Sequence, residues 1–398
     1  MPGATVHDCD GNCNGNGNGN GEDAMSLSSM DDHPVHQVAE VIRHPGTSDR
    51  NFYDRYYFNC HGGDPTLPWL IVGLGVYPNL GVTDCFAVLR HGGDHRVFRA
   101  SRALGAERAD LTVGPFRIEV EQGLERLRLV LDDDNEGVSF DLTFTGISPA
   151  TLEARHFQRR LDRVFIDTMR FVQTGSWSGR LTVADESFDV VPDTWRGNRD
   201  RSWGVRPVGE PEPPGRAVTE TSGSFFWIYA VIACKDHSIV VLLQETSTGE
   251  RVVDETQRIW HDRRRPAEWL GRVEHTIEFR PGTREPTAAT LVFTRPGGAV
   301  TTVGCVPQLA NFLGFGTGYG LEQDWRHGMW QGELEVQNNH TLVADLDDTM
   351  KLFCPIDHLT EFTVSDGESS EHAQGLFEFA VIGPHEQYGF TDYTDVAE

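Results

Sequence analysis

The sequence lacks several features that would place it in a large functional class. Basic side chains are outnumbered, with 34 Lys and Arg against 60 Asp and Glu, so the formal net charge is −26 at pH 7. Such a charge repels phosphate groups and argues against nucleic acid or an anionic membrane surface as a partner. The longest apolar run, residues 225–234, is half of the roughly 20 residues that span a bilayer. We therefore expect no nucleic-acid partner and no integral membrane association.

Cysteines are few and scattered. There are seven, an odd number, and only Cys9 and Cys13 lie close together in the sequence. This pattern suits reduced thiols better than a disulfide framework. The N-terminal segment also has no basic region followed by an apolar core, as a signal peptide would. Both features predict a cytoplasmic protein.

Familiar catalytic and cofactor-binding motifs are missing as well. The sequence has no Walker A motif, no dinucleotide-binding Gly-x-Gly-x-x-Gly after a strand, no His-Glu-x-x-His and no Cys-x-x-Cys. The His-Gly-Gly-Asp segments at 61–64 and 91–94 lack the Gly-x-Ser-x-Gly elbow that an esterase would need, so they are predicted to be turns. We predict no cofactor and no metal, although a metal site assembled from distant residues stays open.

Short alternating segments dominate what is present. Much of residues 97–150 and 272–307 alternates apolar with polar side chains, whereas residues 225–245 are apolar on both faces of a strand. Pro- and Gly-rich turns separate these segments, and only residues 156–173 could hold a short helical turn. An all-β fold with turns every 8–12 residues or so is typical of barrels or sandwiches.

Composition divides the chain into three parts. Residues 1–45 are acidic and rich in Gly and Asn, which predicts a disordered low-complexity tail. The Pro-Glu-Pro-Pro-Gly segment at 211–215 is the clearest domain boundary. We therefore predict one lipocalin-like β-barrel over residues 46–210 and a second over residues 211–398.

A weak internal repeat supports the two halves. Trp177-Ser-Gly-Arg-Leu181 in the first half is echoed by Trp330-Gln-Gly-Glu-Leu334 in the second, and each precedes a predicted strand or its continuation. Asp324 and His327 stand beside the second copy. This cluster of a carboxylate, an imidazole and indoles is a second candidate for a functional site.

The stretch from residue 171 to residue 207 is the first candidate, because it ends in charge and aromatic rings. Its side chains of interest are Trp195, Arg199, Asp200, Arg201, Trp203 and Arg206. Indoles are rare in solvated loops, and clustered arginines are rare in buried strands. The combination predicts a semi-enclosed wall in which guanidinium groups are held by carboxylates and stacked on rings.

The segment GNRDRSWGVRP resembles the AttH/carotenoid 1,2-hydratase (CrtC-like) superfamily of tandem lipocalin-like proteins. The superfamily's Arg/His-Asp-x-x-Trp-Gly-x-Arg motif is matched by Arg199, Asp200, Trp203, Gly204 and Arg206. The residues that precede the motif in the superfamily are matched by Gln173, Gly175, Trp177 and Gly179. The resemblance spans roughly residues 50–395 and implies two packed calycin-type barrels with a largely apolar cavity. Activities in the superfamily include water addition to isoprenoid double bonds and pericyclic cyclisation. Carotenoid hydratases carry a tyrosine and an aspartate on the next strand, where this chain has Tyr229 but no carboxylate.

Alkene hydration needs a proton donor that can form a tertiary carbocation, followed by delivery of water. A carboxylic acid in an apolar pocket has a raised pKa and can donate, while aromatic faces stabilise the cation. We predict catalytic roles for Asp200, His327 and Tyr229. Substrate contacts are predicted for Trp195, Trp203, Arg199, Arg206, Trp227, Asp324 and Trp330.

Structural roles for the same residues stay open. Arg199, Arg201 or Arg206 near Asp200 would hold its carboxylate ionised, which would make the pair a lock where the two barrels join. His327 could equally be a structural histidine.

Three functions are compatible with these observations. The first is a cofactor-free hydratase/dehydratase or isomerase/cyclase that acts on a small apolar, isoprenoid-type molecule. The second is a non-catalytic carrier of a hydrophobic ligand, such as a terpenoid, steroid or lipid, and the third is a scaffold with a filled barrel. An enzyme needs at least one unpaired acid or base that faces its cavity, whereas a carrier can be lined by apolar groups and one orienting polar group.

Overall fold

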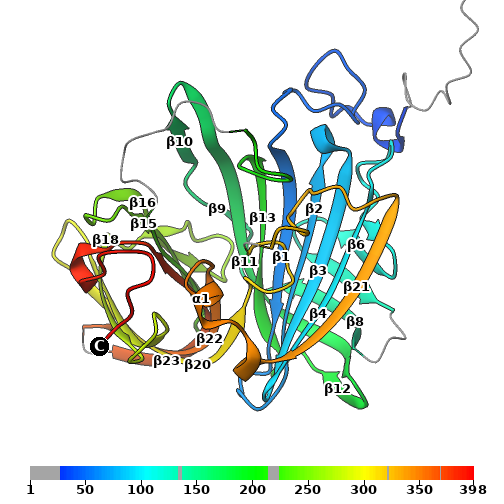
Figure 1. The fold of residues 1–398 in the computed structure, drawn as a ribbon. Helices are drawn as coiled ribbons and strands as arrows, with labels where there is room; N and C mark the ends of the chain where they lie inside the picture. Colours follow the sequence, from blue (N-terminus) through cyan, green and yellow to red (C-terminus); the bar gives the residue numbers. More distant parts are fainter. Residues whose placement is uncertain (1–26, 133–136, 214–223, 321, 368) are drawn as a thin grey trace, which may run out of the picture.

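The chain is built almost entirely of antiparallel strands (Figure 1). The computed structural model describes residues 27–398 except 133–136, 214–223, 321 and 368. Its short helical elements are α1 (Asp348–Lys351) and the 3₁₀ turns η1 (Ser29–Asp32), η2 (Pro78–Leu80), η3 (Val343–Asp345) and η4 (Glu386–Tyr388). None of these described helices is long and apolar enough to cross a membrane. The predicted all-β class is confirmed.

The first sheet has fourteen strands in the order β21-β4-β3-β2-β1-β13-β11-β8-β7-β6-β5, with β9, β10 and β12 also paired to β11. Its strands are β1 (Phe52–Cys60), β2 (Trp69–Tyr77), β3 (Val82–His91), β4 (Asp94–Ala103), β5 (Thr112–Val113), β6 (Phe116–Gln122), β7 (Arg126–Leu131), β8 (Val138–Gly146), β9 (Thr151–Leu152), β10 (His156–Arg160), β11 (Arg163–Val183), β12 (Glu186–Val190), β13 (Arg196–Val205) and β21 (Leu334–Leu342). The expected helical turn within residues 156–173 is wrong, since β10 and β11 pair as a hairpin there and pairing outweighs local preference.

The second sheet has nine strands in the order β17-β16-β15-β14-β23-β22-β20-β19-β18. They are β14 (Phe225–Ala233), β15 (His237–Glu245), β16 (Arg251–Trp260), β17 (Glu268–Trp269), β18 (Arg272–Phe279), β19 (Pro286–Thr294), β20 (Val300–Phe312), β22 (Ile356–Asp366) and β23 (Ser369–Ile382). Each sheet curves into a barrel or half-barrel around its own apolar core, and the two lie side by side (Figure 1).

A third apolar cluster fills the space between the two sheets. Strand β14 shows how the sequence builds it. Phe226 and Ile228 point into the core of the second sheet, whereas Trp227 and Tyr229 point the other way into the shared cluster. Successive strand residues face opposite sides, so a strand with two apolar faces is a strand with two buried faces. Much of the junction between the sheets is therefore apolar.

One strand crosses from the second half of the chain to the first sheet. After β20 the chain runs over the outer face of the first sheet, and β21 then pairs with β4 from Leu334↔Arg102 to Leu342↔Asp94. Figure 1 shows this orange strand among the blue and cyan strands of the first half. The first sheet thus contains a strand from far beyond residue 210.

The predicted tail lies only partly within the described residues. Residues 1–26 fall outside them, as do the last two residues of the predicted boundary at 211–215. Ser29 Oγ donates to Glu107 Oε2 at 2.8 Å, and the Ile42 amide donates to Asp31 Oδ1 at 2.8 Å. Residues 27–45 therefore have defined local structure, since polar side chains tie them to one another and to the loop after β4.

Candidate functional site

Strand β13 distributes the predicted motif over two environments. Arg199 and Arg201 face the core of the first sheet, where Arg201 pairs with Asp54 and its guanidinium lies 4.2 Å from the Tyr56 ring centroid. Asp200 faces the other way, toward the second sheet, because neighbouring strand residues point to opposite sides. The predicted pairing of Asp200 with Arg199, Arg201 or Arg206 is wrong for the described residues, none of which gives it an ion pair.

The glycine of the motif has a backbone reason. Gly204 has φ of +130°, and a Cβ at this position would lie 2.1 Å from the Asp167 carbonyl oxygen of β11. No other residue allows β11 and β13 to approach so closely. Gly204 is therefore required by the sheet rather than by chemistry.

The carboxyl group of Asp200 is buried and unpartnered. The residue is 8% exposed, and no described residue donates a hydrogen bond to its side chain. Burial raises the pKa of Asp200 from 3.8 to about 7, while the Arg170 guanidinium acts in the opposite direction. A carboxyl group with this pKa is present both as an acid and as a base near neutral pH.

Arg170 belongs to a network that joins the two sheets. Its Nε donates to Glu153 Oε2 at 2.6 Å, and the Tyr229 hydroxyl donates to Glu153 Oε1 at 2.9 Å. The guanidinium also lies 4.3 Å from the centroid of the Tyr229 ring. Burial and the Glu153 charge raise the pKa of Tyr229 well above its usual range. Tyr229 is thus a permanent donor that holds Glu153 in place.

A pair of buried carboxyl groups lies near Asp200. Asp357 on β22 and Glu378 on β23 are register partners. Burial raises the pKa of both, and the charge of Glu378 raises that of Asp357 further, whereas the Arg170 guanidinium acts in the opposite direction on Glu378. Tyr57 donates to Asp357 at 2.5 Å, and Trp227 Nε1 donates to Glu378 at 2.5 Å. One donor from each sheet therefore holds the two carboxyl groups in position.

His327 is buried away from this group. Its Nε2 donates to the Thr317 carbonyl oxygen at 2.8 Å, and Nδ1 accepts from Arg55 at 2.9 Å. Burial and the charges of Arg55 and Arg206 hold the pKa of His327 well below its usual range. A neutral ring with both nitrogens engaged anchors the segment between β20 and β21, which supports the structural role.

The other predicted residues are dispersed. Trp195 lies in the core of the first sheet, and Trp203 is partly buried beside Phe171 at a ring distance of 6.4 Å. Asp324 and Trp330 are exposed on the segment before β21. The structure therefore brings together Asp200, Tyr229 and Trp227. The two copies of the internal repeat, which begin at Trp177 and Trp330, do not occupy equivalent positions in the two sheets. Trp177 is 1% exposed within β11, whereas Trp330 is 48% exposed.

A cavity of about 1,130 Å³ opens near the end of β13. Arg206, Phe165, Tyr319 and His327 lie in its wall, together with the segment 206–213. Arg206 contributes to the electrostatic environment of buried Glu378, so the cavity and the carboxyl cluster are electrostatically linked. The cavity itself is lined by the first sheet and by the segments after β13 and after β20.

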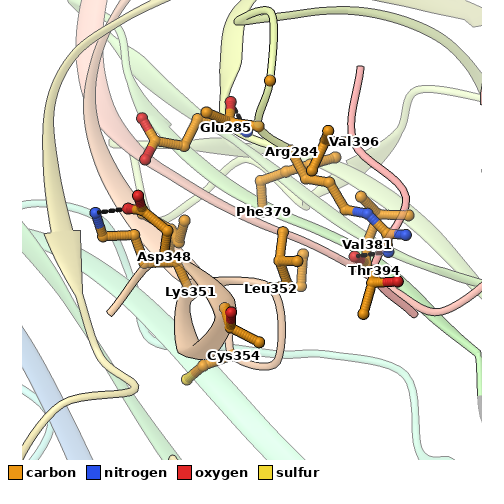
Figure 2. Close-up of a pocket in the computed structure, with 15 residues that line it drawn as sticks. Arg284, Glu285, Asp348, Lys351, Leu352, Cys354, Phe379, Val381, Thr394 and Val396 are labelled. Atoms are coloured by element: carbon orange, nitrogen blue, oxygen red, sulfur yellow. Dashed lines mark hydrogen bonds and ion pairs between the residues drawn. The ribbon is translucent and has the colours of Figure 1, made fainter. Parts of the chain in front are cut away.

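A smaller pocket of about 240 Å³ lies in the second sheet beside α1 (Figure 2). Its cations are already engaged. Arg284 donates to main-chain carbonyl oxygens that include those of Val381 and Gly383, both at 2.9 Å, and Lys351 pairs with Asp348 at 2.7 Å. This pocket therefore offers no free charged group for catalysis.

The sequence reasoning missed Arg170, Glu153, Tyr57, Asp357 and Glu378. One signal was present in the segment LFEFAVIG, where Glu378 interrupts a strand that is otherwise apolar on both faces. A buried charge at such a position must be paired or functional. The other four residues carry no comparable signal, because they come from separate strands or loops.

Comparison with solved structures finds similar chains of very different sequence. CghA with Sch210972 matches with a TM-score of 0.50 at 9% identity, over 83% of this chain and 89% of that chain. Kievitone hydratase from Nectria haematococca matches with a TM-score of 0.45 at 14% identity, over 90% of this chain and 96% of that chain. A structure assigned to AttH from Nitrosomonas europaea matches with a TM-score of 0.49 at 11% identity, over 90% of this chain and 97% of that chain.

At these identities the likeness shows the fold alone. Together with the two curved sheets, the match to CghA confirms the tandem-barrel fold that the sequence resemblance implies. No curated protein matches the sequence. A family model described as a family of unknown function, DUF8625, matches residues 27–391, and the chain belongs to this family.

Proposed function

We propose that the protein is an acid–base enzyme, a hydratase/dehydratase or isomerase/cyclase, that acts on a small and largely apolar molecule between the two sheets. The observation that carries this proposal is the Asp200 carboxyl group, which is buried, unpartnered among the described residues and half protonated near pH 7. A general acid works best when its pKa lies near the working pH. A carrier has no need of such a group.

The proton transfers balance without an external acid. The neutral Asp200 carboxyl group donates its proton to an alkene carbon, and a carbocation forms at the neighbouring carbon. A water molecule adds to that carbon, and the proton it releases returns to the Asp200 carboxylate. The rings of Trp227 and Tyr229 belong to the buried cluster beside Asp200 and would stabilise positive charge there. The reverse sequence is a dehydration.

Access to Asp200 follows one face of β13. Asp200, Ser202, Gly204 and Arg206 alternate along this face, and Ser202 and Gly204 have little or no side chain and are partly exposed. Arg206 at the end of the row lines the cavity of about 1,130 Å³. This supports entry of the substrate past Arg206 toward Asp200.

The cavity favours a substrate with an anionic group. Arg50 and Arg163 in its wall are paired with Glu212. Arg160, Arg206 and Arg326 also line it, and no described residue gives any of them a carboxylate partner. Three uncompensated guanidinium groups would bind a carboxylate or an acidic enol, with the apolar body directed inward. Isoprenoid-type acids are therefore the first class to test.

The test is native mass spectrometry before and after organic extraction, followed by incubation of the extracted ligand in D₂O. We expect a stoichiometric adduct, and solvent deuterium in the product of the wild type but not of the Asp200→Asn variant. Asp324→Asn is the matched control, because Asp324 is an exposed aspartate outside the cluster. An adduct that both the wild type and Asp200→Asn leave unchanged would establish the carrier instead.

A further inference from the structure

A cluster of metal-binding side chains lies at the tip of the β14–β15 hairpin. The Cys234 amide donates to the His237 carbonyl oxygen at 3.0 Å and closes a tight turn, so the two side chains flank it as a cross-strand pair. Glu371 joins them from β23, which pairs with β14 through Ala233↔Gln374. One ligand atom from each of these three side chains lies within 4.8 Å of the other two.

The orientation of His237 points to a missing cation. Its Nδ1 lies 2.8 Å from Asp236 Oδ1, which fixes the ring and leaves the lone pair on Nε2. Nε2 is buried, has no hydrogen-bond partner and lies 3.7 Å from Glu371 Oε1. A lone pair that faces a carboxylate oxygen is unfavourable unless a metal cation or a proton lies between them. A histidine held by a second-shell carboxylate is the usual arrangement in metal sites.

We propose that Cys234, His237 and Glu371 bind a divalent transition-metal ion of the zinc type. One thiolate, one imidazole and one carboxylate form a donor set that suits Zn²⁺ and excludes Mg²⁺ and Ca²⁺, which prefer oxygen alone. The two anionic ligands balance the charge of the ion. Three protein ligands leave a fourth coordination position for water or a ligand.

One of the three ligands borders a second cavity. Cys234 lines a space of about 760 Å³ between the sheets, with His61 and Arg196 in the wall from the first sheet. Cys234 directly follows β14 and is seven residues from Trp227, a separation of about 23 Å in an extended strand. The metal site is therefore independent of Asp200, and neither proposal depends on the other.

Metal binding requires loss of the thiol proton. Burial, followed by the charge of Glu371, raises the pKa of Cys234 above its usual range. A bound cation would reverse this effect and stabilise the thiolate. Without metal, the same geometry would be a protonated His237 held between Asp236 and Glu371, which is the alternative that the experiment must exclude.

The experiment uses the full chain with Cys9→Ser and Cys13→Ser, because those two N-terminal cysteines could bind metal themselves. After treatment with a chelator, Zn²⁺ is titrated by calorimetry and Co²⁺ by absorption spectroscopy. We expect one ion per chain, and for Co²⁺ a thiolate charge-transfer band with the intense d–d bands of a tetrahedral site. Cys234→Ser should remove the charge-transfer band, and His237→Gln should weaken binding about 100-fold or more. Asp236→Asn should weaken it about tenfold, as for a residue that positions a ligand.

The control is His340→Gln, which alters an exposed histidine of the first sheet and should leave the affinity unchanged. If Cys234→Ser does not fold, alkylation of Cys234 in the parent protein gives the same information, since Zn²⁺ should protect the thiol. Absence of stoichiometric binding, Co²⁺ binding without the charge-transfer band, or alkylation that Zn²⁺ does not slow would each overturn the proposal.

Discussion

The two faces of strand β13 carry neighbouring charged residues in opposite conditions. On the face toward the first core, Arg199 donates to Gln173 at 2.8 Å and lies 5.0 Å from the Phe171 ring centroid. On the face toward the second sheet, Asp200 is buried with no hydrogen bond or ion pair from the described residues. The guanidinium on the first face has a side-chain hydrogen bond and a ring contact, although its Nη2 is buried without a partner, whereas the carboxyl group on the second face has no hydrogen bond from the described residues.

This difference separates structure from chemistry within one motif. A buried polar group without a partner destabilises the fold by about 1–3 kcal/mol, so it persists where it has a use. The arginines inside the first barrel hold the sheet together. Asp200 on the other face has no such contact among the described residues, and burial raises its pKa although the Arg170 guanidinium acts against this.

The largest expected effect is on turnover. Asp200→Asn keeps the size and burial of the side chain but removes its proton transfer, which should lower kcat by about 10²–10⁴-fold. Ligand binding should change little, because the arginines of the cavity are untouched. Steady-state kinetics with the extracted ligand, alongside its dissociation constant, measure both. A kcat within threefold of the wild type would remove the functional distinction between the two faces.

The next effect is a pH dependence of stability. The pKa of Asp200 is raised from 3.8 to about 7, so the folded protein holds this proton more tightly than the unfolded chain. The contribution of this proton to the free energy of unfolding is complete below about pH 4 and is lost as the pH rises through about 7. The free energy of unfolding changes by about 4 kcal/mol at most. Asp200→Asn has no such loss. Urea unfolding of both proteins at pH 5 and pH 8 should show the variant gaining relative stability at pH 8, and a constant difference would contradict the raised pKa.

Substitutions on the inner face of β13, the face toward the first core that carries Arg199, should lower stability rather than turnover. Gln173 donates to the carbonyl oxygens of Leu124 and Ser148 and accepts from Arg199, so Gln173→Leu leaves three polar groups without partners. We expect a loss of about 3 kcal/mol in the free energy of unfolding. The kcat of the folded protein should remain within a few-fold of the wild type. Loss of kcat without loss of stability would mean that the inner face takes part in the chemistry.

The smallest effect is expected outside both faces. Trp330 is 48% exposed, so Trp330→Ala should change the free energy of unfolding by less than about 1 kcal/mol and leave ligand affinity unchanged. Chemical denaturation and ligand titration test this. A clear loss of affinity would restore the second predicted cluster as part of the site.

The fold could be predicted from the sequence because its signal is local. Alternation with a period of two, interrupted by turns, is legible in strands such as β6 and β18, and the two apolar faces of β14 indicate a strand buried on both sides. The pairing of β21 with β4 of the first sheet has no signal in the local sequence, because it joins strands that are far apart in the chain.

The site could be predicted only in part, for the same reason. Asp200 and Tyr229 were accessible through their motif and the next strand. The partners that define their chemistry come from other strands, as with Tyr57 and Asp357, which are 300 residues apart in sequence. Charged residues that are adjacent in a strand do not pair with each other. Arg199 and Asp200 are neighbours in the chain but point to opposite sides of the sheet.

The most direct test of the account is the titration of Asp200 itself. Protein labelled with ¹³C at the aspartate carboxyl carbons would be followed by NMR between pH 4 and pH 9, with Asp200→Asn used to assign the resonance. We predict that the assigned carboxyl resonance titrates near pH 7. Titration complete below pH 4.5 would show an ionised Asp200 with a cationic partner, and Asp200 would then be a structural anchor like its neighbours on the inner face.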